Sequence, residues 1–579
     1  MIKKYSIIDI IPLINLPPQV NDFFSYFSEK KIKPGSIVEV EFKKQIIHGY
    51  VFRVEEIEKR RQEIKKYGLN LKPVLKIIND ETVILKKQIS LAFWLKKYAN
   101  LSLASALNMF FLYNQLKLVN KNDFKLKNSL NKKQKYEINN KNYFDKNDIK
   151  NKKSLIIVPR DNYFDYFKIN FPFFYILEPK FINKNIKEVL SFVFSEQKIT
   201  LIGNRNVIFL PWQNLDQIII FEEGSIFYKE FFKPPFIDFR KVFLKFAQIN
   251  KIKYISIDEI PSFYLISKNH SLEKKVENIK FEITKINEQE FENEIKNFKK
   301  TIIFVPEKNF GSKIVCQNCF YTFTCKSCFK FLSLNDKKVY CPYCLKEEKL
   351  PEACPKCNFN DTFIIYHKGA KSIFKYLQYL NRKVYLLEKD SKKIIKNFNK
   401  EKEADLVGSL LLLTPIIEKV DAFFFFNFDQ FYFSNNIFQK EKFIRILNFF
   451  KNKSKNLFIV SNVFDYLIEK KIKEGGILNL ILEERKINNL PPYKRLVILK
   501  EGSVNLENLQ KKMTIIKEKL KKSNPSLEIY GPIFASPFKK RKRFFLELVL
   551  KIETKLDFNL KKILKDIEVE EIDTDALSY

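Results

Sequence analysis

The chain has 579 residues, of which 45% are hydrophobic, and a formal net charge of +37 from 104 Lys and Arg against 67 Asp and Glu. A chain of this length and apolar content buries several cores, which excludes a small single-domain protein and suggests about four domains. It has no apolar run of about 18 residues and no signal peptide, so we expect a soluble, cytoplasmic monomer without a membrane partner. The positive charge suits a polyanion such as nucleic acid, but an AT-rich genome would also add lysine everywhere, so charge alone decides little.

The first 115 residues divide into a strand-rich part and a helical part. In 1–75, the runs SIVEVEF and IIHGYVFRVEE border turns such as Pro34-Gly35, which predicts a small β-rich domain. In 76–115, apolar side chains recur at helical spacing, with Trp94 and Tyr98 four positions apart. We expect a small helical domain there, compatible in size with a winged helix.

A polar stretch separates these parts from an α/β pattern. Residues 116–153 are rich in Asn, Lys and Asp with little periodicity, which indicates a linker. From Leu155, the runs LIIVP, ITLIG, QIIIFEE and YISID predict buried parallel strands with helices between them. The pattern returns later in RKVYLLEKD, ADLVGS, DAFFFFNFD and NLFIVSN. We therefore expect an α/β lobe at 154–300, a second at 301–470 with an insertion at 314–360, and an α+β C-terminal domain at 471–579.

The insertion contains all eight cysteines of the chain, arranged as four CxxC pairs. The pairs are Cys316/Cys319, Cys325/Cys328, Cys341/Cys344 and Cys354/Cys357. Two CxxC turns complete a tetrahedral all-sulfur site, so four turns predict two structural zinc ions. The alternative, a disulfide cluster, needs an oxidising compartment, and i, i+3 pairs suit a shared metal better than a crosslink between distant parts. Closed four-thiolate sites leave no open coordination position, so we expect these ions to fold the segment rather than to catalyse a reaction.

With its four-pair cysteine region, the sequence resembles the primosomal protein N′ family, the PriA-type replication restart helicases. In that family a four-pair cysteine region interrupts the second of two RecA-like helicase lobes. The resemblance implies that the outer pairs (Cys316, Cys319, Cys354 and Cys357) hold one zinc ion and the inner pairs (Cys325, Cys328, Cys341 and Cys344) the other. It also implies that the N-terminal segments LPPQVNDFFSYF, KPGSIVEVEF and HGYVF belong to a domain that binds the 3′ end of a nascent strand at a fork.

Further family landmarks follow in the expected order. GNRNVIFLPWQNLDQIIIFEE resembles the family segment GxRSAxFxPxxNLxxIIxDEE. The matching positions are Gly203, Arg205, Phe209, Pro211, Asn214, Leu215, Glu222 and Glu223. Near the C-terminus, ERKINNLPPYKRL and IYGPIFASPFKKRKRFFLELVL resemble the PPF and GP segments of the family.

The parts that an ATP-driven helicase needs depart from the family pattern. A GxxxxGK[ST] phosphate loop occurs nowhere in the chain, and the sequence on both sides of Leu155 lacks glycine. The DEEH box reads Phe221-Glu222-Glu223-Gly224, so the Asp that would hold Mg²⁺ is replaced by Phe. The SATPS segment reads Asp258-Glu259-Ile260-Pro261-Ser262, and QVAGRAGR has no counterpart between Asn448 and Phe464. We predict no catalytic residues and a lobe pair kept as a scaffold.

DNA contact needs only exposed cations, backbone donors and aromatic rings, so it tolerates sequence drift better than catalysis does. The resemblance places Tyr26 and Phe42 at the 3′-end pocket, although either could be a core residue. The run FKKRKRFF combines cations with phenylalanines, as suits a single strand, or it is a solvated turn between two strands. The candidate DNA contacts are Tyr26, Lys33, Phe42, Lys43, Lys44, Lys326, Lys330, Lys539, Lys540, Arg541, Lys542 and Arg543.

Three functions fit these observations. The first is a PriA-like primosomal protein that binds forks, 3′ ends or single strands in replication restart, recruits the proteins that load the replicative helicase, and lacks ATPase activity. The second is an active ATP-dependent 3′–5′ DNA helicase with an unrecognised nucleotide site. The third is a zinc-stabilised scaffold for protein interactions without DNA binding. We expect the first.

Overall fold

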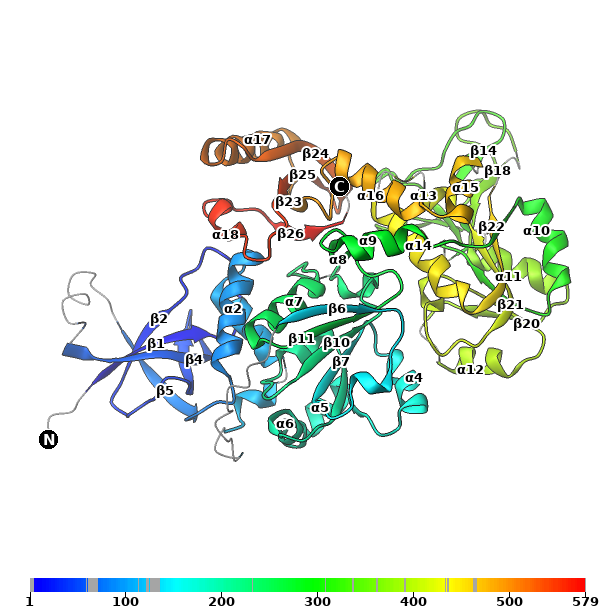
Figure 1. Cartoon of the computed structure of the whole chain (residues 1–579). Coiled ribbons are helices and arrows are strands. Elements are labelled where there is room, and N and C mark those ends of the chain that lie inside the picture. The colour runs from blue at the N-terminus through cyan, green and yellow to red at the C-terminus, as the bar shows by residue number, and fades with distance from the viewer. Residues whose placement is uncertain are drawn as a thin grey trace. The chain divides into compact units, whose positions relative to one another are not determined.

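The computed structural model describes residues 5–58, 60, 71–112, 114–120, 124, 136–231, 233–307, 309–335, 338–360, 363–389, 392–432, 434, 437–461 and 466–577. The chain forms two compact units, one of Met1–Pro261 with Thr554–Glu568 and one of Ser262–Glu553 with Val569–Tyr579. Both combine helices with sheets (Figure 1). The mixed α/β class predicted from the sequence is confirmed.

The N-terminal strands of the first unit close into a barrel in the order β1-β2-β5-β3-β4. The strands are β1 (Ser6–Pro12), β2 (Phe24–Ser28), β3 (Ile37–Phe42), β4 (Gln45–Glu56) and β5 (Lys72–Asn79). Alternate side chains of β3, such as Val38 and Val40, are fully buried in the barrel, as expected for period-two patterning. Lys43 and Lys44 form the two-residue turn between β3 and β4, both with positive φ.

Short helices follow the barrel. They are α2 (Lys86–Tyr98) and α3 (Leu103–Asn108), followed by the 3-10 turns Met109–Phe111 and Asn114–Lys117. Trp94 stacks on Tyr98 with ring centroids 4.6 Å apart, and both side chains are buried. Part of the predicted linker, 121–123 and 125–135, lies outside the described residues, and another part forms β6 (Glu137–Lys141).

A six-stranded parallel sheet forms the first lobe, in the order β6-β11-β10-β7-β9-β8. Its remaining strands are β7 (Ser154–Val158), β8 (Tyr175–Leu177), β9 (Thr200–Asn204), β10 (Gln217–Phe221) and β11 (Lys253–Ile257). The helices of this lobe are α4 (Tyr163–Asn170), α5 (Pro179–Lys184), α6 (Ile186–Phe194) and α7 (Phe239–Asn250). The four strands predicted from the apolar runs are confirmed as β7, β9, β10 and β11.

The second unit contains a similar parallel sheet in the order β12-β22-β21-β13-β20-β19. Its strands are β12 (Ile283–Ile286), β13 (Lys300–Phe304), β19 (Val384–Leu387), β20 (Ala404–Gly408), β21 (Val420–Phe426) and β22 (Ser454–Val460). The helices are α8 (Phe263–Ile266), α9 (His270–Glu277), α10 (Glu288–Glu294), α11 (Ala370–Tyr379), α12 (Lys392–Lys400), α13 (Asp429–Tyr432), α14 (Ile437–Lys451), α15 (Tyr466–Glu474) and α16 (Ile477–Ile487). All four strands predicted after the cysteines are present as β19 to β22.

The cysteine-rich segment is inserted between β13 and α11 as a five-stranded antiparallel sheet, β17-β16-β15-β14-β18. Its strands are β14 (Gly311–Cys316), β15 (Ser333–Asn335), β16 (Lys338–Tyr340), β17 (Glu347–Lys349) and β18 (Phe363–Lys368). The chain enters and leaves at a narrow neck, because a Cβ on Gly369 would lie 2.0 Å from the carbonyl oxygen of Asn309. Glycine is therefore needed at this neck.

The C-terminal part of the second unit is a four-stranded antiparallel sheet, β24-β25-β23-β26, with α17 (Leu506–Ser523) packed on it. The strands are β23 (Arg495–Ser503), β24 (Glu528–Lys540), β25 (Arg543–Ile552) and β26 (Glu571–Ala576). The intervening segment Thr554–Glu568, with α18 (Leu560–Ile563), packs instead in the first unit, where Lys561 Nζ donates to the Pro18 carbonyl at 2.7 Å. Among the described residues, no helix has the length and apolarity needed to cross a membrane.

Candidate functional site

The four CxxC turns share one backbone conformation. In each turn the residue after the second cysteine has positive φ and donates its N–H to the carbonyl of the first cysteine, at 2.7 to 3.0 Å. These residues are Phe320, Phe329, Leu345 and Asn358. The fold thus repeats one local structure four times and points each pair of thiols at a common centre.

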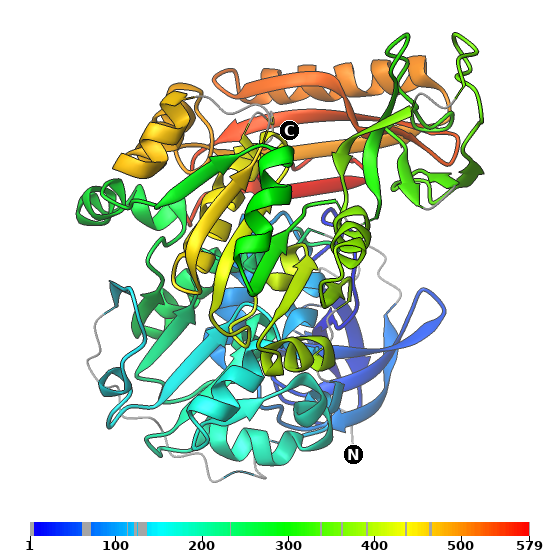
Figure 2. The same cartoon turned by 90° about the vertical axis from the view of Figure 1, so that its right-hand side faces the viewer.

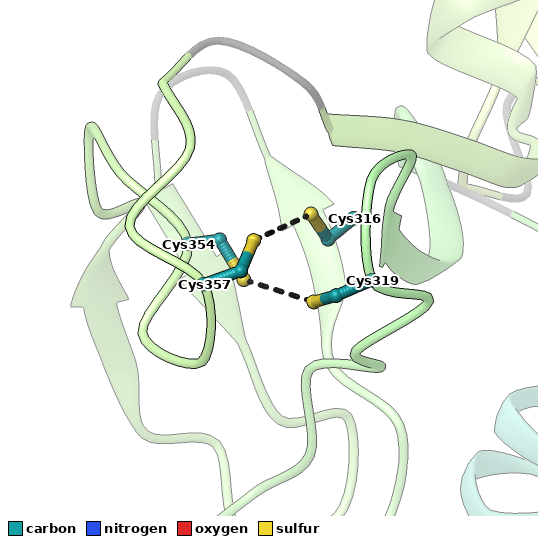
Figure 3. A group of neighbouring side chains, drawn as sticks. All are labelled: Cys316, Cys319, Cys354 and Cys357. Atoms are coloured by element: carbon teal, nitrogen blue, oxygen red, sulfur yellow. Dashed lines mark hydrogen bonds between the residues drawn. The ribbon is translucent and has the colours of Figure 1, made fainter.

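Two groups of four thiols result from this arrangement. Cys316, Cys319, Cys354 and Cys357 form one group, and Cys325, Cys328, Cys341 and Cys344 the other. Within each group all four Sγ atoms lie within 4.8 Å of one another. Figure 3 shows the first group, in which Cys316 Sγ lies 3.7 Å from Cys357 Sγ and Cys319 Sγ lies 3.6 Å from Cys354 Sγ. The grouping into outer and inner pairs is the one that the family resemblance implies.

The sulfur geometry fits a four-coordinate metal. A disulfide would bring two Sγ atoms to about 2.05 Å, whereas Cys328 Sγ and Cys341 Sγ lie 3.4 Å apart and none of the eight cysteines is in a disulfide. Four thiolates at about 2.3 Å from one ion would lie about 3.8 Å apart. Backbone N–H groups also point at the sulfurs, as from Ser327 to Cys325 Sγ at 3.4 Å, and such bonds stabilise thiolate charge. The two groups are therefore candidate metal sites.

The C-terminal cations lie at the end of the β24–β25 hairpin. Arg541 and Lys542 form its two-residue turn, with φ of 49° and 65°, and both are exposed. Lys540 is exposed as well, and Lys539 Nζ lies 4.5 Å from the centroid of the Phe544 ring. Arg543 differs from these, because its guanidinium donates to the Glu570 carboxylate at 2.6 Å and to the Gly502 carbonyl at 2.7 Å.

This hairpin meets the turn that contains Cys325 and Cys328. The Phe329 and Phe538 rings are stacked, with centroids 5.3 Å apart and planes 20° from parallel. Through this contact the turn of Lys326 and Lys330 adjoins the hairpin that contains the cations of 539–542. The ribbons of the cysteine-rich segment and of this hairpin lie beside one another in Figure 2. Phe329 is not among the DNA contacts predicted from the sequence. The available signal was its position after a CxxC pair, where Phe, Phe, Leu and Asn occur in the four turns.

The N-terminal candidates separate into exposed and buried residues. Lys33, Lys43 and Lys44 are exposed at turns of the barrel. Tyr26 is only 5% exposed and donates its hydroxyl to the Glu41 carbonyl at 3.0 Å, and Phe42 is 8% exposed within the barrel core. Burial, and next the Glu41 carboxylate, raise the pKa of the Tyr26 phenol. The burial of these two rings favours the alternative that they are core residues over direct contact with the 3′ end.

The turn between β7 and α4 occupies the place where a phosphate loop would lie, at the carboxyl end of a parallel strand. Tyr163, the first residue of α4, is 1% exposed and donates its hydroxyl to the Glu222 carboxylate. Phe221, which replaces the expected Asp, contacts the rings of Tyr163 and Phe167 with centroids 6.0 Å and 5.2 Å away. This end of the two neighbouring strands is therefore filled by aromatic side chains.

The adjacent carboxylates of Glu222 and Glu223 have different partners. Glu222 accepts from Tyr163 of α4, whereas Glu223 is fully buried and accepts from the Tyr254 hydroxyl of β11 at 3.4 Å. Burial, and next the Glu222 carboxylate, raise the pKa of the Tyr163 phenol well above its ordinary value. Tyr163 therefore keeps its proton and remains a hydrogen-bond donor to Glu222.

Comparison with known proteins places the N-terminal region in a DNA-binding family. Residues 13–111 match the family model of the 3′DNA-binding domain (3′BD) of PriA. This match includes most of the barrel together with α2 and α3, so one family domain extends across the parts predicted separately as 1–75 and 76–115.

The curated relatives are replication restart proteins named PriA. The protein of Helicobacter pylori is 26% identical over 356 residues, which cover 56% of this chain and 57% of that protein. The protein of Rickettsia prowazekii is 24% identical over 434 residues, covering 66% and 65%, and that of Buchnera aphidicola is 25% identical over 412 residues, covering 62% and 56%. The matched part thus spans less than two thirds of each relative. The resemblance inferred from the sequence is confirmed: residues 13–111 match a PriA domain, and the chain is similar to PriA proteins at 26% identity or less to these three relatives.

Proposed function

We propose that this chain is a primosomal DNA-binding protein that recognises forks, 3′ ends and single strands during replication restart, without ATPase or helicase activity. The observation that carries the proposal is the match of residues 13–111 to a 3′DNA-binding domain. Its curated relatives are named as replication restart proteins. Proteins that load the replicative helicase are the proposed protein partners, and the cytoplasm is the proposed compartment.

Exposed cations support DNA binding by the barrel. Lys43 and Lys44 protrude from the β3–β4 turn, and Lys33 lies at the turn before β3. Phosphate contacts require only such charges within reach of the backbone of DNA, and salt weakens them. We assign these three lysines to phosphate contact, and backbone donors of the same turns to the 3′ end.

Two zinc ions complete the proposal. The cysteine groups around Cys316 and around Cys325 would each hold one ion through four thiolates. Zn²⁺ supplies folding free energy at such closed sites and leaves no position open for water or substrate. The zinc-binding segment would then be a structural element of the second lobe.

Absence of ATP hydrolysis is supported by the carboxyl ends of β7 and β10. Cradling a triphosphate requires successive backbone N–H groups facing a free space, together with a lysine and a hydroxyl on Mg²⁺. The turn 159–162 lacks glycine, and the Tyr163 side chain bonded to Glu222 takes up the adjoining space. An active 3′–5′ helicase would need a nucleotide site of another form.

The proposal is tested by binding of labelled forks to zinc-loaded full-length protein across a series of salt concentrations. Forks ending in a 3′-hydroxyl are compared with forks ending in a 3′-phosphate. Tighter binding of the hydroxyl end, with affinity falling steeply as salt rises, is the expected result. Undetectable binding of forks at low salt would instead favour a zinc-stabilised scaffold for protein interactions, and equal binding of the two forks would remove 3′-end recognition from the proposal.

A further inference from the structure

The second zinc-binding turn and the C-terminal hairpin build one continuous aromatic surface, defined here as the stacking surface: Phe329, Phe534, Phe538 and Phe544. Phe538 lies at its centre. Its ring stacks on Phe329 at 5.3 Å, lies 6.5 Å from Phe544 at an interplanar angle of 22°, and meets Phe534 edge-on at 5.4 Å. Rings from two distant parts of the sequence thus form a series.

These rings remain accessible although they contact one another. Phe329 and Phe534 are each 55% exposed. A core aromatic would lose most of its accessible area, so these side chains are not explained by burial alone. Phe329 also has a φ of 58°, a conformation that asparagine adopts more readily, as Asn358 does in the fourth turn. The structure therefore holds an exposed ring where a polar residue would fit the backbone better.

The charge around the stacking surface has one sign. Segments 313–331 and 529–546 contain no aspartate or glutamate. Lys326, Lys540, Arg541 and Lys542 are exposed beside the rings, and Lys539 Nζ lies over Phe544 at 4.5 Å. Arg543 is the exception, because Glu570 pairs with it. The surface thus combines exposed rings with unbalanced positive charge.

We propose that this surface binds single-stranded nucleic acid, with bases stacking on Phe329 and Phe534 and phosphates meeting the cations of the hairpin turn. A single strand exposes both flat bases and a charged backbone, whereas a duplex hides the faces of its bases. A protein surface would not need such unbalanced positive charge. The inference rests on the proposed function and deepens it, since it locates a single-strand site in the second unit, separate from the barrel that would read the 3′ end.

The inner metal site is part of this arrangement. Phe329 directly follows Cys328, and its N–H donates to the Cys325 carbonyl at 2.7 Å. The position of the ring is therefore fixed by the same turn that presents two of the inner thiols. Single-strand affinity is expected to depend on the inner site and much less on the outer one.

The test uses zinc-loaded full-length protein and an oligothymidylate blocked by a 3′-phosphate, so that 3′-end recognition does not contribute. Phe329→Asn removes the ring and suits the left-handed backbone of the turn. It is expected to weaken binding of the blocked strand about tenfold and to leave binding of a blunt duplex unchanged. Phe320→Asn, at the same position of the first turn and 76% exposed in the wild type, is the matched control and should bind like wild type.

A second variant separates charge from stacking. Arg541→Asn with Lys542→Gly removes two charges and keeps residues that favour this hairpin turn. It should weaken single strand and duplex alike and reduce the dependence on salt by about 1.4 in the log–log slope for the single strand. Lys519→Gln with Lys522→Gln removes the same charge from exposed positions of α17 and should change neither.

Metal analysis verifies that each variant keeps its zinc. If Phe329→Asn loses metal, Phe538→Leu is used in its place. Wild-type affinity of both Phe329→Asn and Phe538→Leu for the blocked strand would overturn the inference. Binding of forks but not of the blocked strand by the wild type would overturn the inference and leave the recognition of forks and 3′ ends in the proposed function standing. Binding of neither would overturn both.

Discussion

Two kinds of turn in this chain differ in which site residues they contain: the four CxxC turns between β14 and β18, and the turn 159–162 between β7 and α4. The CxxC turns keep all eight thiols in two groups within 4.8 Å. The β7–α4 turn has no glycine, and the Tyr163 side chain lies beside it, bonded to Glu222. A metal site depends on a few side chains at fixed spacing, whereas a phosphate loop depends on the backbone of every residue in it.

A sequence rich in Lys, Asn and Phe suits nucleic-acid binding and ATP hydrolysis to different degrees. Added lysines and phenylalanines are compatible with nucleic-acid binding, which uses charge and rings. In the proposed function, the turn 159–162 without glycine and Phe221 in place of an aspartate do not support ATP hydrolysis, which requires a backbone phosphate cradle and a carboxylate for Mg²⁺. We therefore propose that this chain binds DNA but does not hydrolyse ATP.

The largest effect is expected from loss of a metal site. Cys328 is fully buried in the inner group, so Cys328→Ser should reduce zinc from two ions to about one per chain and unfold much of the segment around it, because a structural zinc site contributes on the order of 10 kcal/mol. Metal analysis and hydrogen exchange of β14–β18 measure this. The strands of the two lobes serve as internal controls and should keep their protection. Unchanged metal content would show that the inner thiols are not ligands.

A smaller effect is expected in the β7–α4 region. Tyr163→Phe removes the hydroxyl that donates to Glu222 and leaves a partly buried carboxylate with one partner fewer. A hydrogen bond to a charged group is lost, so the free energy of unfolding should fall by about 1–3 kcal/mol. Urea denaturation monitored by circular dichroism measures the change. Tyr143→Phe, at a tyrosine 75% exposed, should stay within about 0.5 kcal/mol. If both variants unfold alike, the bond between Tyr163 and Glu222 does not stabilise this end of the sheet.

The next prediction concerns DNA binding by the barrel, where two lysines of the β3–β4 turn are replaced by uncharged residues. Lys43→Asn with Lys44→Gly keeps residues suited to a two-residue turn with positive φ and removes two cations. The salt dependence of fork binding should fall by about 1.8 in the log–log slope if both lysines contact duplex phosphates. Fluorescence anisotropy across a salt series gives the slope, and Lys519→Gln with Lys522→Gln is the control. An unchanged slope would remove the β3–β4 turn from the DNA interface.

The smallest effect concerns Arg543, whose guanidinium is paired with Glu570. Glu570→Gln frees this cation beside the stacking surface and should tighten single-strand binding about twofold at low salt, while stability changes by less than about 1 kcal/mol because the pair is exposed. Titration of the blocked oligothymidylate measures the affinity. Weaker binding by Glu570→Gln would indicate that the pair holds the hairpin in its binding conformation.

Much of the fold could be predicted because its signals are local. Eight apolar runs predicted β7, β9 to β11 and β19 to β22. CxxC spacing predicted two four-thiol sites, and the family resemblance implied which pairs share each site. By contrast, β6 has the sequence EINNK, with three of its five side chains exposed, and it joins the sheet only by pairing with β11. Such a strand has no apolar pattern that sequence could reveal.

The stacking surface could not be predicted for a related reason. Phe329 and Phe538 meet only because the zinc-binding segment and the C-terminal hairpin adjoin in the folded unit. Phe329 follows a CxxC pair and Phe538 begins a run of cations, but neither local signal indicates that the two rings meet. Likewise, the sequence does not assign Tyr26 and Phe42 to the surface or the core, because their burial results from strands that pair to close the barrel.

One measurement tests the central claim, that binding persists without catalysis, most directly. ATP hydrolysis is followed in zinc-loaded full-length protein with and without a saturating fork, in the same sample whose fork binding is measured by anisotropy. The account predicts tight, salt-dependent fork binding and no hydrolysis above that of a buffer control. Hydrolysis stimulated by the fork, and retained through further purification, would contradict it and show that the chain holds a nucleotide site of another form.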